Sequence, residues 1–140
     1  MKAIVTGHTR GLGAALAANL LARGVPVLGL ARTRSAELVD AYPDLFDEVE
    51  LDLADSVALS RWLADGMLGD YLDGTGAVLL LNNAGMVSPV GPLDAQDPQA
   101  VLRAVQLNVA APLARTTEDR FPMRKRFVDM KETGALVEPD

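Results

Sequence analysis

Short apolar runs alternate with longer amphipathic segments along most of this chain. Lys2–Val5, Val25–Ala31 and Ala77–Leu81 are almost continuously hydrophobic, which is typical of strands covered on both faces. Phe46–Leu51 alternates apolar residues with acids and predicts a further strand. We expect Ala77–Leu81, the most apolar of these runs, to be a central strand of the sheet.

The segments between these runs have the spacing of helices. Leu12, Leu16 and Leu20 recur every four residues and predict the apolar stripe of a helix that ends near Arg23 and Gly24. A short helix is expected from Ser35 to Tyr42, and two further helices open at Asp55 or Ser56 and at Asp97. On the helix from Asp55 or Ser56, the expected apolar side contains Val57, Leu59, Trp62, Leu63 and Leu68. The helix from Asp97 runs towards Pro112, and its expected apolar side contains Leu102, Val105 and Val109.

This alternation predicts an α/β fold with a doubly wound parallel sheet, the Rossmann fold, and the strand order 3-2-1-4. Ligands of such sheets bind in the crevice at the carboxyl ends of the strands, beside the switch point between strands 1 and 4. Three stretches that interrupt the apolar pattern fall at these ends: Val5–Gly13, the residues after Ala31, and Asn82–Gly85. We therefore expect a nucleotide site at this edge of the sheet.

Val5–Gly13 is a glycine turn between the first strand and the first helix, with the spacing Gly-x-x-x-Gly-x-Gly. The free N–H groups and the positive dipole end of that helix favour an anion at the turn, typically a pyrophosphate. Gly7 would permit the turn, Gly11 the approach of the phosphates, and Gly13 the packing of helix on strand. Three glycines in a short window also occur in ordinary turns, so this loop alone does not distinguish a phosphate-binding turn from an ordinary one.

Composition and charge narrow the class of protein. The chain has 140 residues, which suits one domain, and its 49% hydrophobic and 4% aromatic content predicts a core of Leu, Val and Ala. A net charge of −6 argues against a nucleic-acid partner. The sequence has no cysteine and only one histidine, so no metal site is expected. Without a run of about 18 apolar residues or a signal-peptide pattern, a cytoplasmic protein with no membrane partner is expected.

Four motifs occur in a characteristic order: the glycine turn after Thr6, then Asp52-Leu53, then Asn82–Gly85, then Asn108 in Leu-Asn-Val. Together they resemble the short-chain dehydrogenase/reductase family, and more loosely its bacterial sepiapterin- and benzil-reductase-like members. The resemblance implies an oxidoreductase that moves hydride between a nicotinamide cofactor and a carbonyl or alcohol. It also implies a homodimer or homotetramer that pairs through the helices around Asn108.

The resemblance also assigns roles to single residues. Gly7, Gly11 and Gly13 would surround the pyrophosphate, with a backbone N–H from Leu12. Asp52 would accept from the adenine amino group and Leu53 would line that pocket, while Asn83, Ala84 and Gly85 would follow the adenosine ribose. Asn82 would tie neighbouring strands together, and Asn108 would be the catalytic-helix asparagine that holds a water of the proton relay. The residues alone also leave a second reading for each: Asp52 as a solvated acid, Asn108 as an amide satisfied by a kinked helix before Pro112, and Asn82-Asn83 as a plain turn, which the five buried residues before it disfavour.

Charge at the end of the second strand favours NADP(H) over NAD(H). An NAD site places an acid there, which binds the ribose 2′-hydroxyl and repels a 2′-phosphate. Here Ala31 occupies the position, followed by Arg32 and Arg34, with Arg10 on the facing loop. Guanidinium groups suit a phosphate, although three solvated loop arginines would give the same sequence.

The chain departs from the family at its chemical centre. The family uses a serine and a Tyr-x-x-x-Lys pair, in which lysine lowers the tyrosine pKa for acid–base work. Tyr42 is followed four residues later by Phe46, and Tyr71 by Thr75, so neither has the spacing. Ser88 lies in the loop after Gly85 and is not assigned the serine's role.

The organisation expected from this departure is a Rossmann half over 1–115 and a C-terminal helical segment of the same domain over 116–140. Residues of a longer enzyme would be missing between Arg115 and Thr116, which should then lie far apart, with a distinct helix over 121–134. Two functions stay open: an NADP(H)-dependent reductase of small carbonyl or alcohol substrates, and a non-catalytic NADP(H)-binding or sensor module of the same fold.

Overall fold

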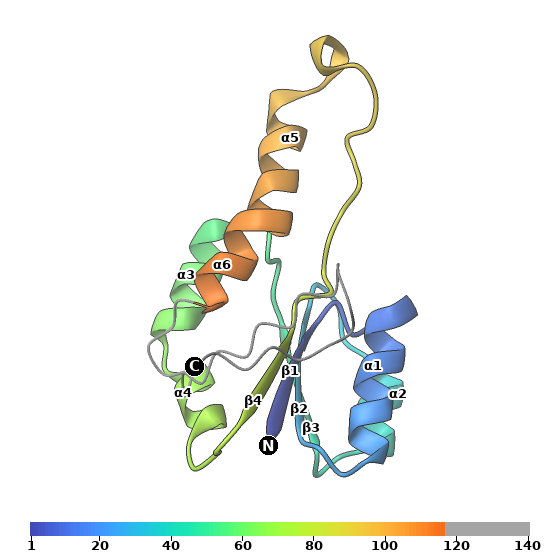
Figure 1. The fold of residues 1–140 in the computed structure, drawn as a ribbon, viewed down its shortest axis with the longest axis vertical. Helices are drawn as coiled ribbons and strands as arrows, with labels where there is room; N and C mark the ends of the chain where they lie inside the picture. The colour runs from blue at the N-terminus through green and yellow to red at the C-terminus, as the bar shows by residue number, and fades with distance from the viewer. Residues whose placement is uncertain (117–140) are drawn as a thin grey trace, which may run out of the picture.

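Four strands form a parallel sheet in the computed structural model, which describes residues 1–116 (Figure 1). The strands are β1 (Lys2–Thr6), β2 (Val27–Ala31), β3 (Phe46–Glu50) and β4 (Val78–Leu81). Their order is β3-β2-β1-β4, and each neighbouring pair is parallel. The predicted Rossmann fold and its strand order are therefore confirmed.

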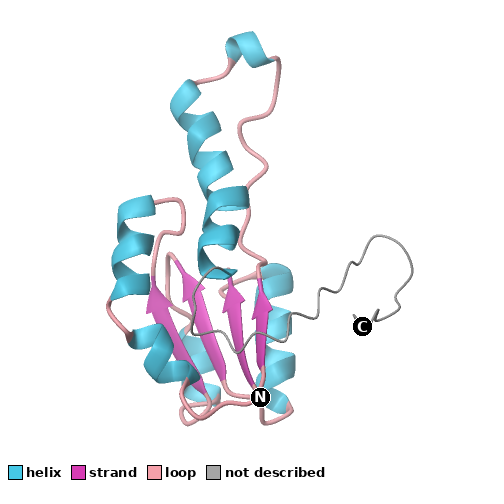
Figure 2. Cartoon of the chain, turned by 60° about the vertical axis from the view of Figure 1, so that its left-hand side comes forward, coloured by secondary structure: helices cyan, strands magenta, loops and turns pink. Residues whose placement is uncertain are grey.

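Helices cover both faces of the sheet (Figure 2). One layer contains α1 (Gly11–Ala22) and α2 (Ala36–Ala41); the other contains α3 (Ser56–Ala64), α4 (Met67–Leu72) and α6 (Ala111–Thr116). The chain after β4 leaves the sheet as an arm, built from a loop, the 3₁₀ turn η1 (Leu93–Ala95) and α5 (Pro98–Val105). The π-helical turn η2 (Gln106–Ala110) joins α5 to α6.

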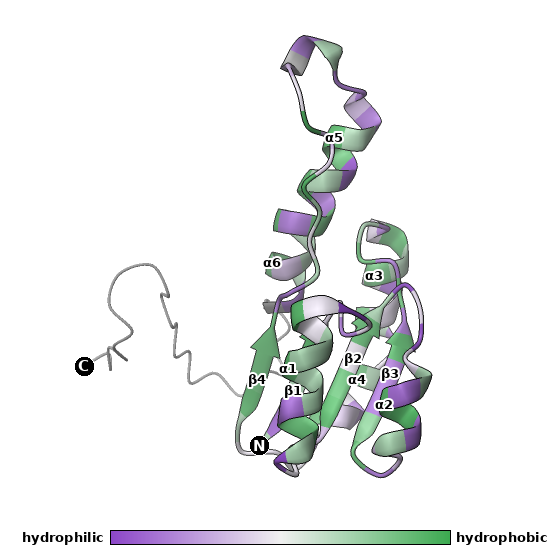
Figure 3. Cartoon of the chain, turned by 90° about the vertical axis from the view of Figure 1, so that its right-hand side faces the viewer, coloured by the Kyte–Doolittle hydropathy of each residue, from purple (hydrophilic) through white to green (hydrophobic). Residues whose placement is uncertain are grey.

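The alternation of side chains along β1 divides the core in two. Ala3 and Val5 belong to the cluster under α1 and α2, and Ile4 belongs to the cluster under α3, α4 and α6. Strands β2 and β4 are apolar along their whole length, whereas β3 combines apolar with acidic residues (Figure 3). The first cluster also contains Ala17, Leu21, Val27, Leu38 and Phe46; the second contains Leu28, Leu30, Leu51, Leu53, Leu59, Trp62, Leu68, Leu72 and Ala111.

The buried stripe of α1 is not the predicted one. Gly13, Ala17 and Leu21 are buried, whereas Leu12 is 68% exposed. The helix turns its small residues to the sheet because they let its backbone approach the strands closely. The predicted end is confirmed: Gly24, at φ +75°, follows the C-cap Arg23.

Capping on the next helices agrees with the prediction only in part. Ser35 is the N-cap of α2, but its side chain makes no capping bond. Asp55 caps α3 and accepts from the N–H groups of Val57 and Ala58, both at 3.0 Å. The predicted apolar side holds for Leu59, Trp62 and Leu68, but Val57 is 64% exposed. The helix also breaks at Gly66, whose φ of +91° ends α3 before α4 begins.

Strand β4 differs from its predicted central place. Within residues 1–116 it is an edge strand that pairs only with β1, and all of its residues are partly exposed. In that same part of the chain, no helix is long and apolar enough to cross a membrane.

The helix predicted from Asp97 is confirmed, with a wide turn that the sequence did not predict. Asp97 accepts from the N–H of Gln99 at 3.2 Å and caps α5. Pro112 has no N–H to offer the carbonyl of Asn108, and Ala111 instead donates to Gln106, five residues back. Arg115 and Thr116 are consecutive residues of α6, without the predicted separation. The predicted helix over 121–134 lies outside the described residues, and the two-part organisation stays a prediction.

Candidate functional site

A cavity of about 910 Å³ opens at the carboxyl edge of the sheet. This volume falls in the range of small-molecule and cofactor sites. The predicted site residues on its wall are Gly7, Arg10, Ala31, Arg32, Asp52, Leu53, Asn83, Ala84 and Gly85. Three interruptions of the apolar pattern, far apart in the sequence, therefore meet around one space.

The other predicted residues lie off this wall. Gly11, Leu12, Gly13, Arg34 and Asn108 are not among the residues that line the cavity. Gly13 instead packs against the turn, since a Cβ there would lie 2.1 Å from the carbonyl oxygen of Gly7. Gly11, at φ +57°, has no atom within 4 Å of an added Cβ, so its outer side is open.

The glycine turn is fixed from two sides. The N–H of Gly7 donates to Leu30 of β2 at 2.8 Å. From the other side, the Asn83 Nδ2 donates to the carbonyl of Thr6 at 3.0 Å and to that of Gly7 at 3.2 Å. The turn is therefore held rigidly at the switch point between β1 and β4.

The role predicted for Asn82 belongs to its neighbour. Asn83 ties the end of β4 to β1, while Asn82 is exposed and accepts from Arg115 Nη2 at 2.7 Å. Side chains of consecutive residues leave an extended segment on opposite sides, so only one of the two can face the glycine turn. Burial lowers the pKa of the Arg115 guanidinium to about 10.

Asp52 forms an ion pair that the sequence did not predict. Arg103 Nη2, on α5, donates to Asp52 Oδ2 at 2.6 Å, and the N–H of Ala54 donates to Oδ1 at 3.0 Å. Partial burial raises the pKa of the Asp52 carboxyl. The two hydrogen bonds and the charges of Arg103 and Arg32 lower it by more than burial raises it, so the pKa lies below the usual value. Arg103 thereby joins the cavity wall.

Asn108 clamps the loop that leaves β4. Its Oδ1 accepts from the N–H of Met86 at 2.9 Å, and its Nδ2 donates to the carbonyl of Met86 at 2.7 Å. Both polar atoms of the Asn108 amide therefore bond to the backbone of Met86, which follows the cavity residue Gly85. This agrees with an amide satisfied locally at the distorted turn of the helix, and its predicted place in a proton relay stays a prediction.

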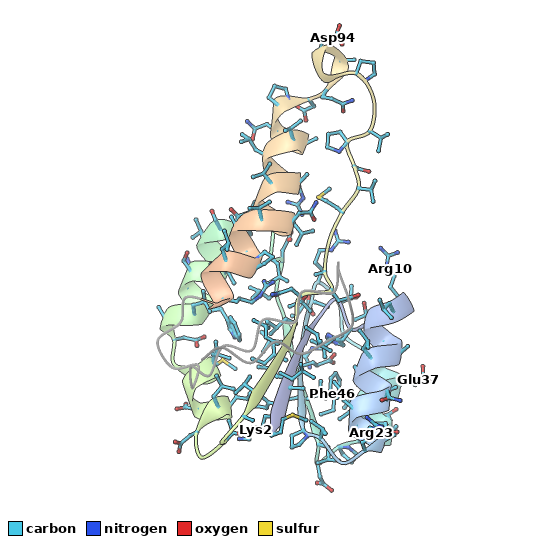
Figure 4. The ribbon with its side chains drawn as sticks, viewed as in Figure 1. Lys2, Arg10, Arg23, Glu37, Phe46 and Asp94 are labelled. Carbon is cyan, nitrogen blue, oxygen red and sulfur yellow. The ribbon has the colours of Figure 1, made fainter. Side chains whose placement is uncertain are left out.

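The residues present fit a dinucleotide. The glycine turn supplies an open, positively polarised helix end for phosphates, and Arg10 projects from that end of α1 (Figure 4). Asp52 offers a carboxylate acceptor on the same wall as Leu53, whose side chain belongs to the apolar core. An acceptor beside an apolar surface suits the edge and face of an adenine ring.

Comparison with known proteins agrees with this geometry. The sequence profile of the family described as short chain dehydrogenase matches residues 1–127. The chain is 29% identical to the benzil reductase ((S)-benzoin forming) of Bacillus cereus, over 81% of this chain and 47% of that protein. A crystal structure of a short-chain dehydrogenase/reductase from Burkholderia vietnamiensis is 56% identical, with a TM-score of 0.80, over 82% of this chain and 53% of that one.

A metagenomic short-chain oxidoreductase, solved in complex with NADP, is 28% identical with a TM-score of 0.61, over 80% of this chain and 52% of that one. The chain thus spans about half the length of these relatives. The profile match covers most of the sequence and includes every motif that carries the predicted resemblance. On this evidence the chain belongs to the short-chain dehydrogenase/reductase family.

Proposed function

We propose that this chain binds NADP(H) in the cavity at the carboxyl edge of its sheet, as part of a short-chain oxidoreductase. The observation that carries the proposal is the convergence of the glycine turn, Arg32, Asp52 and Asn83 around one space of cofactor size. The pyrophosphate would lie at the turn, with Gly7, Gly11 and Gly13 around it and the N–H of Leu12 directed to it. Asp52 and Leu53 would hold the adenine, and Asn83, Ala84 and Gly85 the ribose.

The preference for NADP(H) over NAD(H) rests on charge. Ala31 ends β2 without a carboxylate, and Arg10 and Arg32 line the cavity from two sides. A 2′-phosphate between them would gain charge-assisted hydrogen bonds that a ribose hydroxyl cannot provide. The metagenomic relative in complex with NADP supports the same choice.

The proposed reaction is hydride transfer between the nicotinamide and a small carbonyl or alcohol substrate. The bound cofactor would supply or accept the hydride, and this chain would hold the adenine, ribose and pyrophosphate of that cofactor in place. Asn108, through its hold on Met86, would fix the loop that follows the ribose-binding residues. Benzil reductases among the relatives favour a carbonyl substrate.

The sequence contains no Tyr-x-x-x-Lys pair for the proton transfer. We therefore extend the proposal to a longer enzyme, in which this chain supplies the cofactor-binding half and further residues supply the family's catalytic serine, tyrosine and lysine. The lack of a Tyr-x-x-x-Lys pair also favours one alternative, in which the chain binds NADP(H) without catalysis and acts as a sensor module.

Calorimetric titration of the purified protein with NADPH and with NADH tests the binding proposal. NADPH should bind more tightly; equal affinities or a preference for NADH would contradict the cofactor assignment. Intact mass and reductase activity separate the two functions. A mass far above 14.8 kDa with turnover of a diketone supports the complete enzyme, whereas a mass of 14.8 kDa without turnover leaves the binding module.

Homo-oligomerisation through the arm is part of the same proposal. Leu102, Val105 and Val109 follow one another at spacings of three and four residues and so share one side of the helix. They are 60%, 50% and 52% exposed, respectively. An apolar stripe of this kind is stabilised when a second copy covers it, and a dimer or tetramer would provide that cover.

A further inference from the structure

The residue directly after Gly7 in the glycine turn is a buried histidine. His8 is fully buried, and its Nε2 lies 2.9 Å from Oε2 of Glu48, whose side chain is 5% exposed. A carboxylate only accepts hydrogen bonds, so Nε2 donates. Neither side chain lines the cavity, and the cofactor contacts proposed above use neither of them.

The same carboxylate oxygen reaches a third segment. Glu48 Oε2 accepts from the backbone N–H of Ser35 at 2.9 Å. Ser35 is the N-cap residue of α2, and its own side chain makes no capping bond. One carboxylate of β3 therefore connects the glycine turn to the start of α2.

The position of the imidazole ring is closely fixed. A Cβ on Gly29 of β2 would lie 2.5 Å from His8 Nδ1, so only glycine leaves room for the ring. Phe46 lies edge-on to the ring, with centroids 5.3 Å apart. Nδ1 is buried without a hydrogen-bond partner among the described residues. Burying this nitrogen without a hydrogen bond costs free energy. An apolar side chain of similar shape would avoid that cost, so packing alone does not require a histidine at position 8.

The bridge acts on the loop that carries the cavity arginines. Only three residues, Arg32, Thr33 and Arg34, separate the end of β2 from Ser35. The first end of this loop is anchored where Leu51 donates to the carbonyl of Ala31 at 2.7 Å. The second end is anchored at Ser35 by Glu48, and through Glu48 it is tied to the glycine turn.

We infer that the His8–Glu48–Ser35 bridge is a positioning device for cofactor choice, an inference that rests on the proposed NADP(H) binding. It sets the place of the Arg32 loop relative to the glycine turn, which carries Arg10. Both arginines then line the same cavity, in which a 2′-phosphate would lie. A broken bridge frees one end of the loop and selectively weakens the contacts that only the 2′-phosphate makes.

The test compares NADPH and NADH affinities by calorimetry for the parent protein and for three variants of Glu48. Glu48→Ala removes the acceptor, Glu48→Asp shortens the side chain by one methylene but keeps its charge, and Glu48→Gln keeps an acceptor oxygen at the same reach. Glu37→Ala is the matched control, because Glu37 is an exposed acid on the outer side of α2 (Figure 4).

We expect the ratio of NADPH to NADH affinity to fall by about fivefold in Glu48→Ala, the effect of about one hydrogen bond, and by a smaller factor in Glu48→Asp. Glu48→Gln and Glu37→Ala should retain the parent ratio. A purely structural role would lower both affinities or the thermal stability and leave the ratio unchanged, which would overturn the inference. If Glu48→Ala does not fold, the ratio in Glu48→Asp decides.

The parent titration separates this inference from the proposed function. A parent that binds neither nucleotide overturns the proposed function and the bridge's role with it. A parent that binds both nucleotides, with the same ratio in Glu48→Ala or Glu48→Asp, overturns the bridge's role alone.

Discussion

A Cβ atom on Gly13 would lie 2.1 Å from the carbonyl oxygen of Gly7 and 2.4 Å from Asn83 Nδ2. Since real Cβ contacts are never this short, even one methyl group at position 13 must push α1 away from the turn. We expect Gly13→Ala to lower the free energy of unfolding by about 1–3 kcal/mol and to abolish NADPH binding. Chemical denaturation and calorimetry measure the two effects.

Gly76→Ala is the control for this substitution. Gly76 has no atom within 4 Å of an added Cβ and no positive φ, so the same chemical change should alter neither quantity. NADPH binding by Gly13→Ala at parent affinity would show that the turn does not cradle the phosphates.

The second prediction concerns the charge at the end of β2. Arg32→Ala should weaken NADPH binding by about ten- to a hundredfold, the worth of a charge-assisted contact, and leave NADH binding nearly unchanged. Arg23→Ala removes the same charge at the opposite end of α1 from Arg10 (Figure 4), and should alter neither affinity. An equal loss of NADPH and NADH binding in Arg32→Ala would contradict a 2′-phosphate contact.

The third prediction is a pH dependence from Asp52. Its pKa lies below the usual value in the folded protein, so the Arg103 pair stabilises the fold above the unfolded pKa and loses this effect as pH falls through the folded pKa. The pair is partly exposed and should contribute about 0.2–1 kcal/mol at neutral pH. The free energies of unfolding of the parent and Arg103→Ala, measured with urea, should therefore converge as the pH falls through the usual pKa range of an aspartate and below it.

Carboxyl NMR titration checks the cause directly. In Arg103→Ala the pKa of Asp52 should rise, because a donor and a positive charge are removed. Arg61→Ala, at an exposed arginine of α3, should leave it in place. An unchanged pKa in Arg103→Ala would mean that the ion pair does not persist in solution.

Local patterns predicted the strands well because the apolar content of a buried strand is a property of consecutive residues. The stripe of α1 was mispredicted for a physical reason: leucine is the more hydrophobic residue, but close approach to the sheet selected Gly13 and Ala17. The order of residues likewise did not reveal which of Asn82 and Asn83 faces the turn, since that depends on the direction of each side chain after β4.

The long-range polar contacts were beyond the reach of the sequence. Glu48 occurs in a run of alternating acids, as a solvent-facing strand residue would, yet it bonds to a histidine 40 positions away. Arg103 is an ordinary helix arginine until the fold brings it to Asp52, 51 positions away. The first pair depends on how β3 lies relative to the glycine turn and the second on how the arm meets the sheet, and no local pattern records either arrangement.

The last prediction concerns the apolar stripe of the arm. Val105 lies at its middle, between Leu102 and Val109, and is 50% exposed. In a dimer or tetramer that buries this stripe, Val105→Glu places a charge in the interface without a partner, which should dissociate the assembly. Val57→Glu is the control, because Val57 is 64% exposed and belongs to α3 rather than to the stripe. Light scattering after size exclusion should show an oligomer for the parent and the Val57→Glu control, and a monomer for Val105→Glu. A monomeric parent, or an oligomer that survives Val105→Glu, would show that this stripe is not the surface where two copies meet.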